Sequence, residues 1–266
     1  MAQALRGPGE YGSFAEEYNE GRPSFPQWIF DQIVKLAETP SLQERGLVNV
    51  LDVGCGTGVA TRQLYQNGFK RLIGMDRDSR MIAVANRHKQ PSSQIVYLTA
   101  PAEEMPFADE TFDIVTTFGS LYWFGQEPGW SFDLERVMKR RALFVAADEK
   151  LLDLSPEYVN IVQTYAPYRT AAAVEPNSLE SILFRSRLEY LRPETGGYLA
   201  HRESAVVFSV DQMFRYYMTG SSRSLISPRR IEAFKRDVLE FCKRQADDHG
   251  RIPCRFTHSV HFARAY

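Results

Sequence analysis

Residues 48–61, VNVLDVGCGTGVAT, decide the fold. An apolar run in this stretch ends at an acidic residue and continues into three glycines spaced two positions apart. A buried strand that ends in a glycine-rich turn and leads into a helix presents backbone N–H groups and bare Cα surface to a ligand. We therefore expect the turn at 54–58 to hold a nucleotide-like molecule.

The composition and the charge narrow the class of protein. The chain has 266 residues, of which 44% are hydrophobic and 24% are charged. This length supports one sizeable core without requiring two independent domains, so we expect one α/β domain over 1–266 with a cap. The formal net charge is -1, which lacks the basic excess that binding to a phosphate backbone needs. A nucleic-acid partner is therefore not expected.

The cysteines and the apolar runs bear on the cellular location. Cys55, Cys242 and Cys254 are scattered, without the paired spacing of a zinc site or the density of a disulfide scaffold. They indicate a reducing compartment and no bound metal. The first twelve residues lack the apolar stretch of a signal peptide, and no later run approaches the length of a membrane span. We expect a cytoplasmic protein that does not enter a membrane.

Hydrophobic patterning predicts alternating strands and helices in the first 150 residues. Ser24 to Gln27 fits a capping box followed by apolar residues at helical spacing, which predicts a helix within an N-terminal helical element, 1–45. Strands that alternate with helices predict a parallel sheet covered on both faces, here the cofactor-binding core at 46–150. The expected strands are 47–53, 71–76, 94–98, 112–118 and 142–147, and the expected helices follow Thr57, follow Ser79 and occupy about 130–138.

The pattern changes after Asp148, where helix starts follow one another closely. We expect residues 154–220 to form an inserted, mainly helical cap over the ligand edge of the sheet, with candidate strands at 188–191 and 205–208. Residues 221–266 then supply a closing helix, from Arg229 to about Gln245, and a closing strand at 255–264. The serines that predict the helix starts are Ser155, Ser209 and Ser227.

The glycine turn does not fit a dinucleotide site. The dinucleotide fingerprint requires its third glycine one position later, where Val59 stands. Asp76 lies where the second expected strand ends, so its carboxylate could accept hydrogen bonds from both hydroxyls of a ribose. A glycine turn followed by an acid at the next strand end is a much stronger signal than the turn alone.

Several motifs, in order along the first half of the chain, resemble class I S-adenosylmethionine-dependent methyltransferases. The resemblance is to the group that contains the ubiquinone-biosynthesis and trans-aconitate methyltransferases. LDVGCGTG at 51–58 is similar to the methionine-binding loop, and GMDRDSRM at 74–81 is similar to a ribose-binding acid followed by an adenine-packing methionine. AEEMPF at 102–107 is similar to the adenine-edge segment, and FDIV at 112–115 is similar to the fourth strand. SLYWF at 120–124 is similar to the segment after that strand, and YNEGRPSFP at 18–26 is similar to an N-terminal element.

The resemblance implies both a fold and a cofactor. The implied fold is Rossmann-like α/β, with a mostly parallel seven-stranded sheet and helices on both faces. The implied cofactor is S-adenosyl-L-methionine, with Asp76 on its ribose, Glu103 on its adenine amino group and Arg22 directed to its carboxylate. The full implied set of cofactor-binding residues is Tyr18, Arg22, Asp52, Gly54, Cys55, Gly56, Gly58, Asp76, Arg77, Met81, Ala102, Glu103 and Phe118.

The chain departs from the family pattern at three places. Pro101 stands where many relatives carry an aspartate, so Glu103 is expected to contact the adenine amino group alone. Tyr122 replaces a frequent histidine and leaves a phenol that is protonated near neutral pH. The turn at 139–142, KRRA, lacks the usual paired glycines. The charged run 136–141 is expected to be a solvated helix end.

Methyl transfer from a sulfonium requires alignment of nucleophile, carbon and sulfur more than it requires catalytic side chains. If the acceptor is a hydroxyl or an amine, a base must remove its proton, and the candidates are Asp148, Glu149, His201 and Tyr122. If the acceptor is a carboxylate, an arginine clamp would suffice. The candidates for contact with the substrate are Trp123, Arg169 and Arg202.

The leading hypothesis is a methyltransferase acting on a small organic acceptor. The first alternative is a nucleic-acid methyltransferase on the same fold, although residues 117–120, TFGS, lack the Asn/Asp-Pro-Pro-aromatic signature of enzymes that methylate exocyclic amines. The second is a non-catalytic module that binds S-adenosylmethionine. The residues leave open the acceptor, the methylated atom and the oligomeric state.

Overall fold

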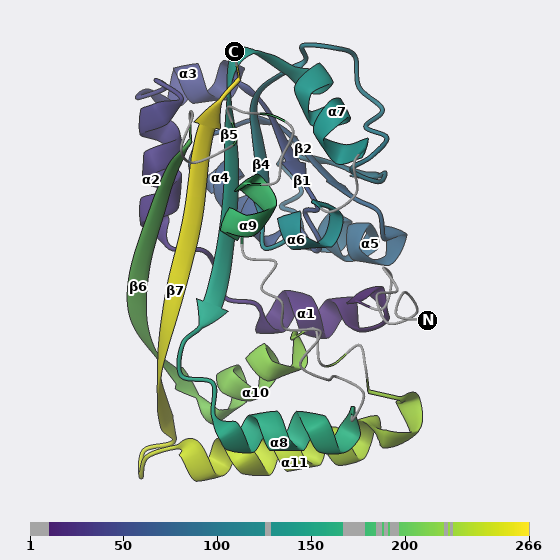
Figure 1. The fold of residues 1–266 in the computed structure, drawn as a ribbon, viewed down its shortest axis with the longest axis vertical. Helices are drawn as coiled ribbons and strands as arrows, with labels where there is room; N and C mark the ends of the chain where they lie inside the picture. Colours follow the sequence, from purple (N-terminus) through teal and green to yellow (C-terminus); the bar gives the residue numbers. More distant parts are fainter. Residues whose placement is uncertain are drawn as a thin grey trace. The chain divides into compact units, whose positions relative to one another are not determined.

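The computed structural model describes residues 11–125, 129–166, 179–184, 188, 191, 197–220, 223 and 226–265. The chain divides into two compact units (Figure 1). We call Met1–Pro23, Glu149–Pro176 and Arg202–His258 the helical unit, and Ser24–Asp148, Asn177–His201 and Ser259–Tyr266 the sheet unit.

One seven-stranded sheet has the strand order β3-β2-β1-β4-β5-β7-β6. The pairs β1–β2, β1–β4, β2–β3 and β4–β5 are parallel. β7 runs antiparallel to β5, because Arg141 donates its N–H to Ala265 while Leu152 donates to Arg255. The mostly parallel α/β fold is thereby confirmed. The strands are β1 Asn49–Val53, β2 Arg71–Asp76, β3 Val96–Thr99, β4 Phe112–Phe118, β5 Met138–Leu151, β6 Tyr198–Ser209 and β7 Arg251–Arg264.

Helices cover both faces of the sheet within the sheet unit. Successive residues of a strand point to opposite faces, and Val50 and Leu51 accordingly belong to two different core clusters. One cluster contains side chains of α2 (Gln27–Leu36), α4 (Val59–Gln66) and α5 (Ser79–His88). The other contains side chains of α6 (Leu121–Phe124), α7 (Gly129–Val137) and α9 (Leu179–Phe184) (Figure 1). A short helix, α3 (Leu42–Leu47), precedes β1.

The helical unit has a core of its own. Tyr158 stacks on Tyr217 with ring centroids 3.9 Å apart, and Phe234 and Phe241 are buried beside them. Gly21 allows a close approach of two helices, because a Cβ there would lie 2.4 Å from the carbonyl oxygen of Arg215. The elements of this unit are a 3-10 turn at Tyr11–Phe14, α1 Ala15–Gly21, α8 Pro156–Tyr165, α10 Val210–Met218, a 3-10 turn at Pro228–Arg230 and α11 Ile231–Gln245.

Of the four serines expected to cap helix starts, two do so and two do not. Ser209 forms a capping box with Gln212, and the Ser155 side chain caps α8. The capping box expected at Ser24 is wrong, because Pro26 occupies the N-cap position of α2 and no side chain caps that helix. Ser227 precedes a 3-10 turn, and its side chain makes no cap hydrogen bond.

The stretch 154–220, expected to be a mainly helical cap, contains α8, α9 and α10 but also a long strand. The predicted strand at 205–208 is confirmed, and it extends over Tyr198–Ser209 as β6, at one edge of the sheet. In the candidate strand at 188–191, the described residues Leu188 and Leu191 lie in no strand. Long alternating segments such as β6 give a weaker hydrophobic signal than a buried run, because an edge strand keeps polar side chains on its exposed face.

Candidate functional site

The glycine turn between β1 and α4 is built from left-handed backbone. Gly54, Gly56 and Gly58 have φ values of 68°, 55° and 78°. Cys55 donates its N–H to the carbonyl of Met75 at 2.9 Å, which ties the turn to the end of β2. Gly58 is the N-cap of α4 and supplies no side chain there. The N-terminal N–H groups of α4 therefore face the turn without a side-chain cap, as a ligand site at a helix N-terminus requires.

Two of these glycines are also required by their neighbours. A Cβ at Gly54 would lie 2.6 Å from the Ser120 Oγ, and a Cβ at Gly58 would lie 2.3 Å from the Tyr97 Oη. Both distances are far below van der Waals contact, so the walls at Ser120 and Tyr97 leave room for bare backbone only. The turn is thus a cradle of bare backbone.

Asp52 is buried beneath the turn. Its carboxylate accepts hydrogen bonds from the Thr61 hydroxyl at 2.5 Å and from the Thr116 hydroxyl at 3.0 Å. Desolvation raises the pKa of Asp52 to about 6. With an exposed fraction of 0%, the side chain joins β1 to α4 and β4 and holds the turn in place.

Asp76 connects the two strand ends directly. Its Oδ2 accepts the Gly56 N–H at 2.9 Å, and its Oδ1 accepts the Asp78 N–H at 2.9 Å. Burial raises the pKa of the Asp76 carboxyl, against the effect of these two hydrogen bonds. A carboxylate offers about four acceptor positions, so two remain for hydroxyl donors. The glycine turn and the strand-end acid therefore lie in direct contact.

Thr57 and Cys55 complete the turn. The Thr57 Oγ1 is buried and has no hydrogen-bond partner among the residues that the structure describes. Such buried polar atoms are rare unless a water or a ligand satisfies them. Burial raises the pKa of the Cys55 thiol well above its ordinary value, so this thiol stays protonated. The donor set and the unsatisfied hydroxyl fit a polar ligand bound at the turn.

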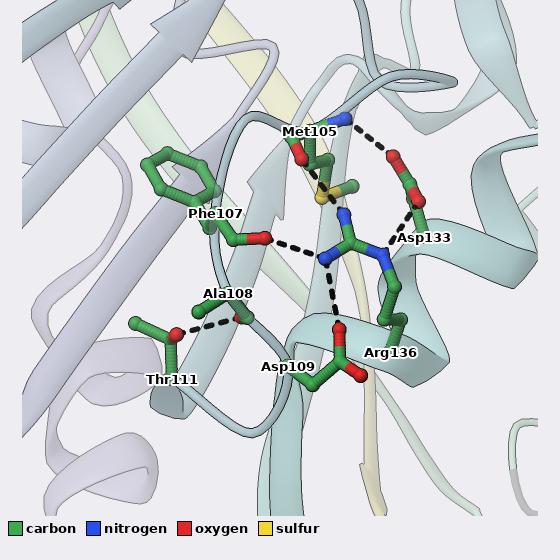
Figure 2. A network of polar contacts seen from close by, with 7 residues as sticks. All are labelled: Met105, Phe107, Ala108, Asp109, Thr111, Asp133 and Arg136. Carbon is green, nitrogen blue, oxygen red and sulfur yellow. Dashed lines mark hydrogen bonds and ion pairs between the residues drawn. The ribbon is translucent and has the colours of Figure 1, made fainter.

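The segment 102–107 is held by α7, as Figure 2 shows. The Arg136 guanidinium donates to the carbonyls of Met105, at 2.7 Å, and of Phe107. Asp133 accepts the Met105 N–H and, at 3.0 Å, a hydrogen bond from Arg136. Both backbone polar groups of Met105 are therefore fixed by α7. Arg136 lies in the last turn of α7, as expected, but four acceptors surround its guanidinium, the fourth being Asp109, so it is not simply solvated. The expected helix end is wrong for residues 138–141, which belong to β5.

Hydroxyl groups near the end of β4 and just after it form a chain beside the turn. The Ser120 Oγ donates to the Val53 carbonyl at 3.0 Å and lies 2.6 Å from the Thr117 Oγ1. Phe118 packs against Phe25 and Phe30, with centroid distances of 4.9 Å and 5.7 Å. This β4 end is adjacent to β1 in the sheet.

The other predicted residues of the sheet unit differ in exposure. Met81 on α5 and Ala102 are buried, Glu103 is half-buried, and Arg77 is exposed after β2. Tyr122 is half-buried, whereas the Trp123 side chain is 45% exposed. His201 is exposed on β6, with its Nδ1 2.9 Å from the Ser259 Oγ. Asp148 is half-buried on β5.

Tyr18, Arg22, Glu149 and Arg202 belong to the helical unit. Arg22 follows α1 and donates from Nε to the Tyr18 hydroxyl at 3.3 Å. Its Nη1 lies 3.8 Å from Glu149 Oε1, and the other carboxylate oxygen of Glu149 lies 3.3 Å from His258 Nε2. Arg202 is exposed on β6, and Arg169 lies outside the described residues.

Sequence reasoning missed the contacts made by His258 and Arg136. His258 stands in an alternating strand, and only its burial shows that it faces inward. Arg136 belongs to a charged run whose composition gives no sign of the carbonyls it would meet. Within the described part of the chain, no cluster of three potential metal ligands is found, and none of the described helices is both long and apolar enough to cross a membrane.

Comparisons with known proteins agree with this geometry. Residues 51–146 match the family model described as a methyltransferase domain. The chain is 25% identical over 158 residues to a Saccharomyces cerevisiae protein named as a probable S-adenosylmethionine-dependent methyltransferase, CRG1, covering 57% of this chain and 49% of that protein. It is 28% identical over 193 residues to the ubiquinone biosynthesis O-methyltransferase of Rhizobium etli, covering 65% and 72% respectively.

The fold is shared with a solved structure from Anaeromyxobacter dehalogenans, a candidate type II methyltransferase. The TM-score is 0.57 at 23% identity, over 92% of this chain and 97% of that one. The matches confirm the resemblance to class I S-adenosylmethionine-dependent methyltransferases, with the methyltransferase domain at 51–146 and S-adenosylmethionine as the cofactor of that class. The chain spans about half the length, or less, of the first curated relatives it matches.

Proposed function

We propose that the chain transfers a methyl group from S-adenosyl-L-methionine to a small organic acceptor. The observation that carries the proposal is the direct hydrogen bond between the Gly56 N–H and Asp76, which joins the ends of β1 and β2 at the backbone cradle. Ligands of open α/β sheets bind outside the carboxyl ends of the strands, which is where this cradle lies.

Different residues of the sheet unit bind different parts of the cofactor. In this proposal the bare backbone of 54–58 holds the methionyl part, and the Thr57 hydroxyl satisfies its hydrogen bonding there. The free acceptor positions of Asp76 take the ribose hydroxyls. The segment that begins at Ala102 and Glu103 contacts the adenine edge, with Met81 packed near the base.

The cofactor supplies an electrophilic methyl group, and the protein aligns the acceptor with that group and excludes water from both. Asp52 fixes the turn through Thr61 and Thr116, and Arg136 fixes the adenine-edge segment. Because these contacts already hold the turn and the segment in place, less conformational entropy is lost when the reactants are aligned. The O-methyltransferase relative and the near-neutral net charge favour a small-molecule acceptor over nucleic acid. A cytoplasmic location, expected from the cysteine usage, belongs to the same proposal.

Isothermal titration with S-adenosylhomocysteine tests the proposal. Asp76→Asn keeps the size of the side chain but removes the charge that strengthens the ribose hydrogen bonds, and we expect affinity to fall about 10-fold to 100-fold. Asp248→Asn, at an exposed aspartate of the helical unit, is the matched control and should leave the affinity unchanged. Absence of binding to the unaltered chain, or equal affinities for all three proteins, would contradict the proposal. Tight RNA or DNA binding with a steep salt dependence would instead favour a nucleic-acid acceptor.

A further inference from the structure

A basic cavity lies at the edge of the sheet opposite to the glycine turn. It has a volume of about 210 Å³, well above the roughly 10–15 Å³ that one water molecule needs. All of its lining residues belong to the sheet unit, beside the starts of β1, β4 and β5. These three strands are parallel, so their starts lie at the opposite edge from the turn that follows β1. The charged residues that line the cavity are Asp113, Lys139, Arg140, Arg141 and Arg264.

An irregularity in β5 brings three consecutive cations to this cavity. The pairing of β4 with β5 shifts register between Phe112 and Ile114, where the segment 139–142 lies opposite Asp113 alone. Successive residues of a regular strand point to opposite faces, yet the first three residues of this segment, all cationic, line one cavity. Extra residues in one strand of a pair often redirect side chains next to functional sites. The irregularity therefore gathers charges that regular pairing would separate.

Arg141 holds a backbone conformation that favours glycine. Its φ is 61°, and this left-handed region costs free energy for a residue with a Cβ. The end of β7 fixes the conformation, because the Arg141 N–H donates to the Ala265 carbonyl at 3.2 Å and the Arg141 carbonyl accepts from Arg264 at 3.1 Å. Glycine would adopt the same backbone without strain. The backbone thus gives no reason for an arginine here, which leaves its side chain as the reason.

Two of the cations at the cavity have no partner. Lys139 and Arg264 are each paired with a carboxylate, at 2.8 Å and 3.2 Å. Arg140 and Arg141 are exposed, and neither guanidinium forms a hydrogen bond or an ion pair within the part of the chain that the structure describes. Neighbouring charges of one sign repel each other. An anion with a charge near −2 would neutralise both and use their free N–H donors.

We propose that this cavity binds a phosphate group, with Arg140 and Arg141 as its main ligands. A phosphate monoester carries about −1.5 to −2 charges near pH 7, which matches the two unpaired cations. A guanidinium donates two parallel hydrogen bonds to phosphate oxygens, and a terminal phosphate has enough oxygens for two guanidiniums. A single carboxylate has one charge and two oxygens, so it would satisfy one arginine only. The site is separate from the glycine turn, and its existence does not depend on the proposed function.

Isothermal titration of the full chain with glycerol 3-phosphate and with inorganic phosphate tests the site. We expect saturable binding at one site per chain with a Kd below about 1 mM. Arg141→Asn removes the cation and keeps a residue that enters the left-handed region readily, and Arg140→Gln removes the other cation. Each should weaken the binding of both phosphates about tenfold. Arg71→Gln, at an exposed arginine that starts β2 at the same edge of the sheet, is the matched control and should leave it unchanged.

The two phosphate probes also distinguish the source of the ligand. Tighter binding of glycerol 3-phosphate than of inorganic phosphate would identify a phosphorylated small molecule, and equal binding would identify free phosphate. S-adenosylhomocysteine should bind Arg141→Asn and the unaltered chain equally, because the glycine turn lies at the other edge of the sheet. The urea midpoint of Arg141→Asn should not fall; if it does, Arg140→Gln alone decides the outcome.

Several results would overturn the inference. One is the absence of saturable binding of both phosphate probes to the unaltered chain. Another is an unchanged affinity in the arginine variants, or an equal loss in Arg71→Gln. Malonate, a dicarboxylate of similar charge, should bind more weakly than glycerol 3-phosphate, and equal binding would show that the cavity attracts any dianion. Binding of a single-stranded RNA more tightly than either phosphate, weakened by Arg141→Asn, would instead show a nucleic-acid surface.

Discussion

Replacing Arg136 by methionine should destabilise the chain and loosen the segment 102–107 together. The side chain donates to two backbone carbonyls, Met105 and Phe107, and to two carboxylates, Asp133 and Asp109. Methionine keeps most of the aliphatic stem and removes all four hydrogen bonds. The variant therefore isolates the polar contribution of the guanidinium.

The magnitude follows from the exposure of each partner. A hydrogen bond from a charged donor to a buried acceptor contributes about 1.5–3 kcal/mol, and we halve that value because the Arg136 side chain is 33% exposed. Asp109 is 75% exposed, and exposed ion pairs contribute little. The two carbonyl bonds then give a loss of about 2 kcal/mol in the free energy of unfolding. Arg136→Lys should recover about half, because an ammonium cannot span both carbonyls.

Urea unfolding measures the stability, and titration with S-adenosylhomocysteine measures the ordering of the segment. We expect affinity to fall about tenfold in Arg136→Met, because binding must then order the segment. Arg140→Met is the control, since Arg140 is an exposed arginine nearby in the sequence, and surface changes cost less than about 0.5 kcal/mol. A loss below about 0.5 kcal/mol in Arg136→Met, or equal losses at positions 136 and 140, would refute the reasoning.

Two other substitutions test the turn. Gly58→Ala should destabilise the chain by about 2 kcal/mol or more, because a left-handed alanine costs about 1 kcal/mol and its Cβ would meet the Tyr97 ring. The control is Gly119→Ala, where the glycine is also left-handed but has open space around it, so that only the backbone cost remains. Equal urea midpoints for the two variants would contradict this prediction. Asp52→Asn should remove a pH dependence: the folded-state pKa of Asp52 is about 6 against an ordinary 3.8, so the native protein binds the proton more tightly and loses stability as pH rises between about 4 and 6. The stability of the variant relative to the unaltered chain should therefore increase by about 2 kcal/mol from pH 4 to pH 7. A difference independent of pH would show that Asp52 titrates normally.

Local patterns predicted the cofactor half of the fold closely. β2 and β4 have the expected bounds, Arg71–Asp76 and Phe112–Phe118, because short apolar runs closed by turn residues leave little freedom. The contact between Gly56 and Asp76 agrees with the position of both at strand ends, since parallel strands bring their carboxyl ends to one edge.

The tertiary contacts of individual side chains could not be predicted in the same way. Arg136 and Arg140 stand in one charged run, yet only Arg136 reaches backbone carbonyls, because that depends on the path of 102–107 past α7. His258 pairs with a residue 109 positions away, a separation that no local pattern encodes. The Ser24 capping box failed for a local reason, since Pro26 already has the extended conformation of an N-cap residue.

The hydroxyl chain from Thr117 through Ser120 to the Val53 carbonyl has an evolutionary consequence. Ser120 fills the space that a Cβ at Gly54 would need, so a bulkier residue after β4 would press on the turn itself. Sequence drift beyond β4 is therefore constrained at Ser120 and freer at Trp123, whose side chain is 45% exposed. Substitutions at Trp123 should accordingly be tolerated during divergence where paired changes at Gly54 and Ser120 would be needed together.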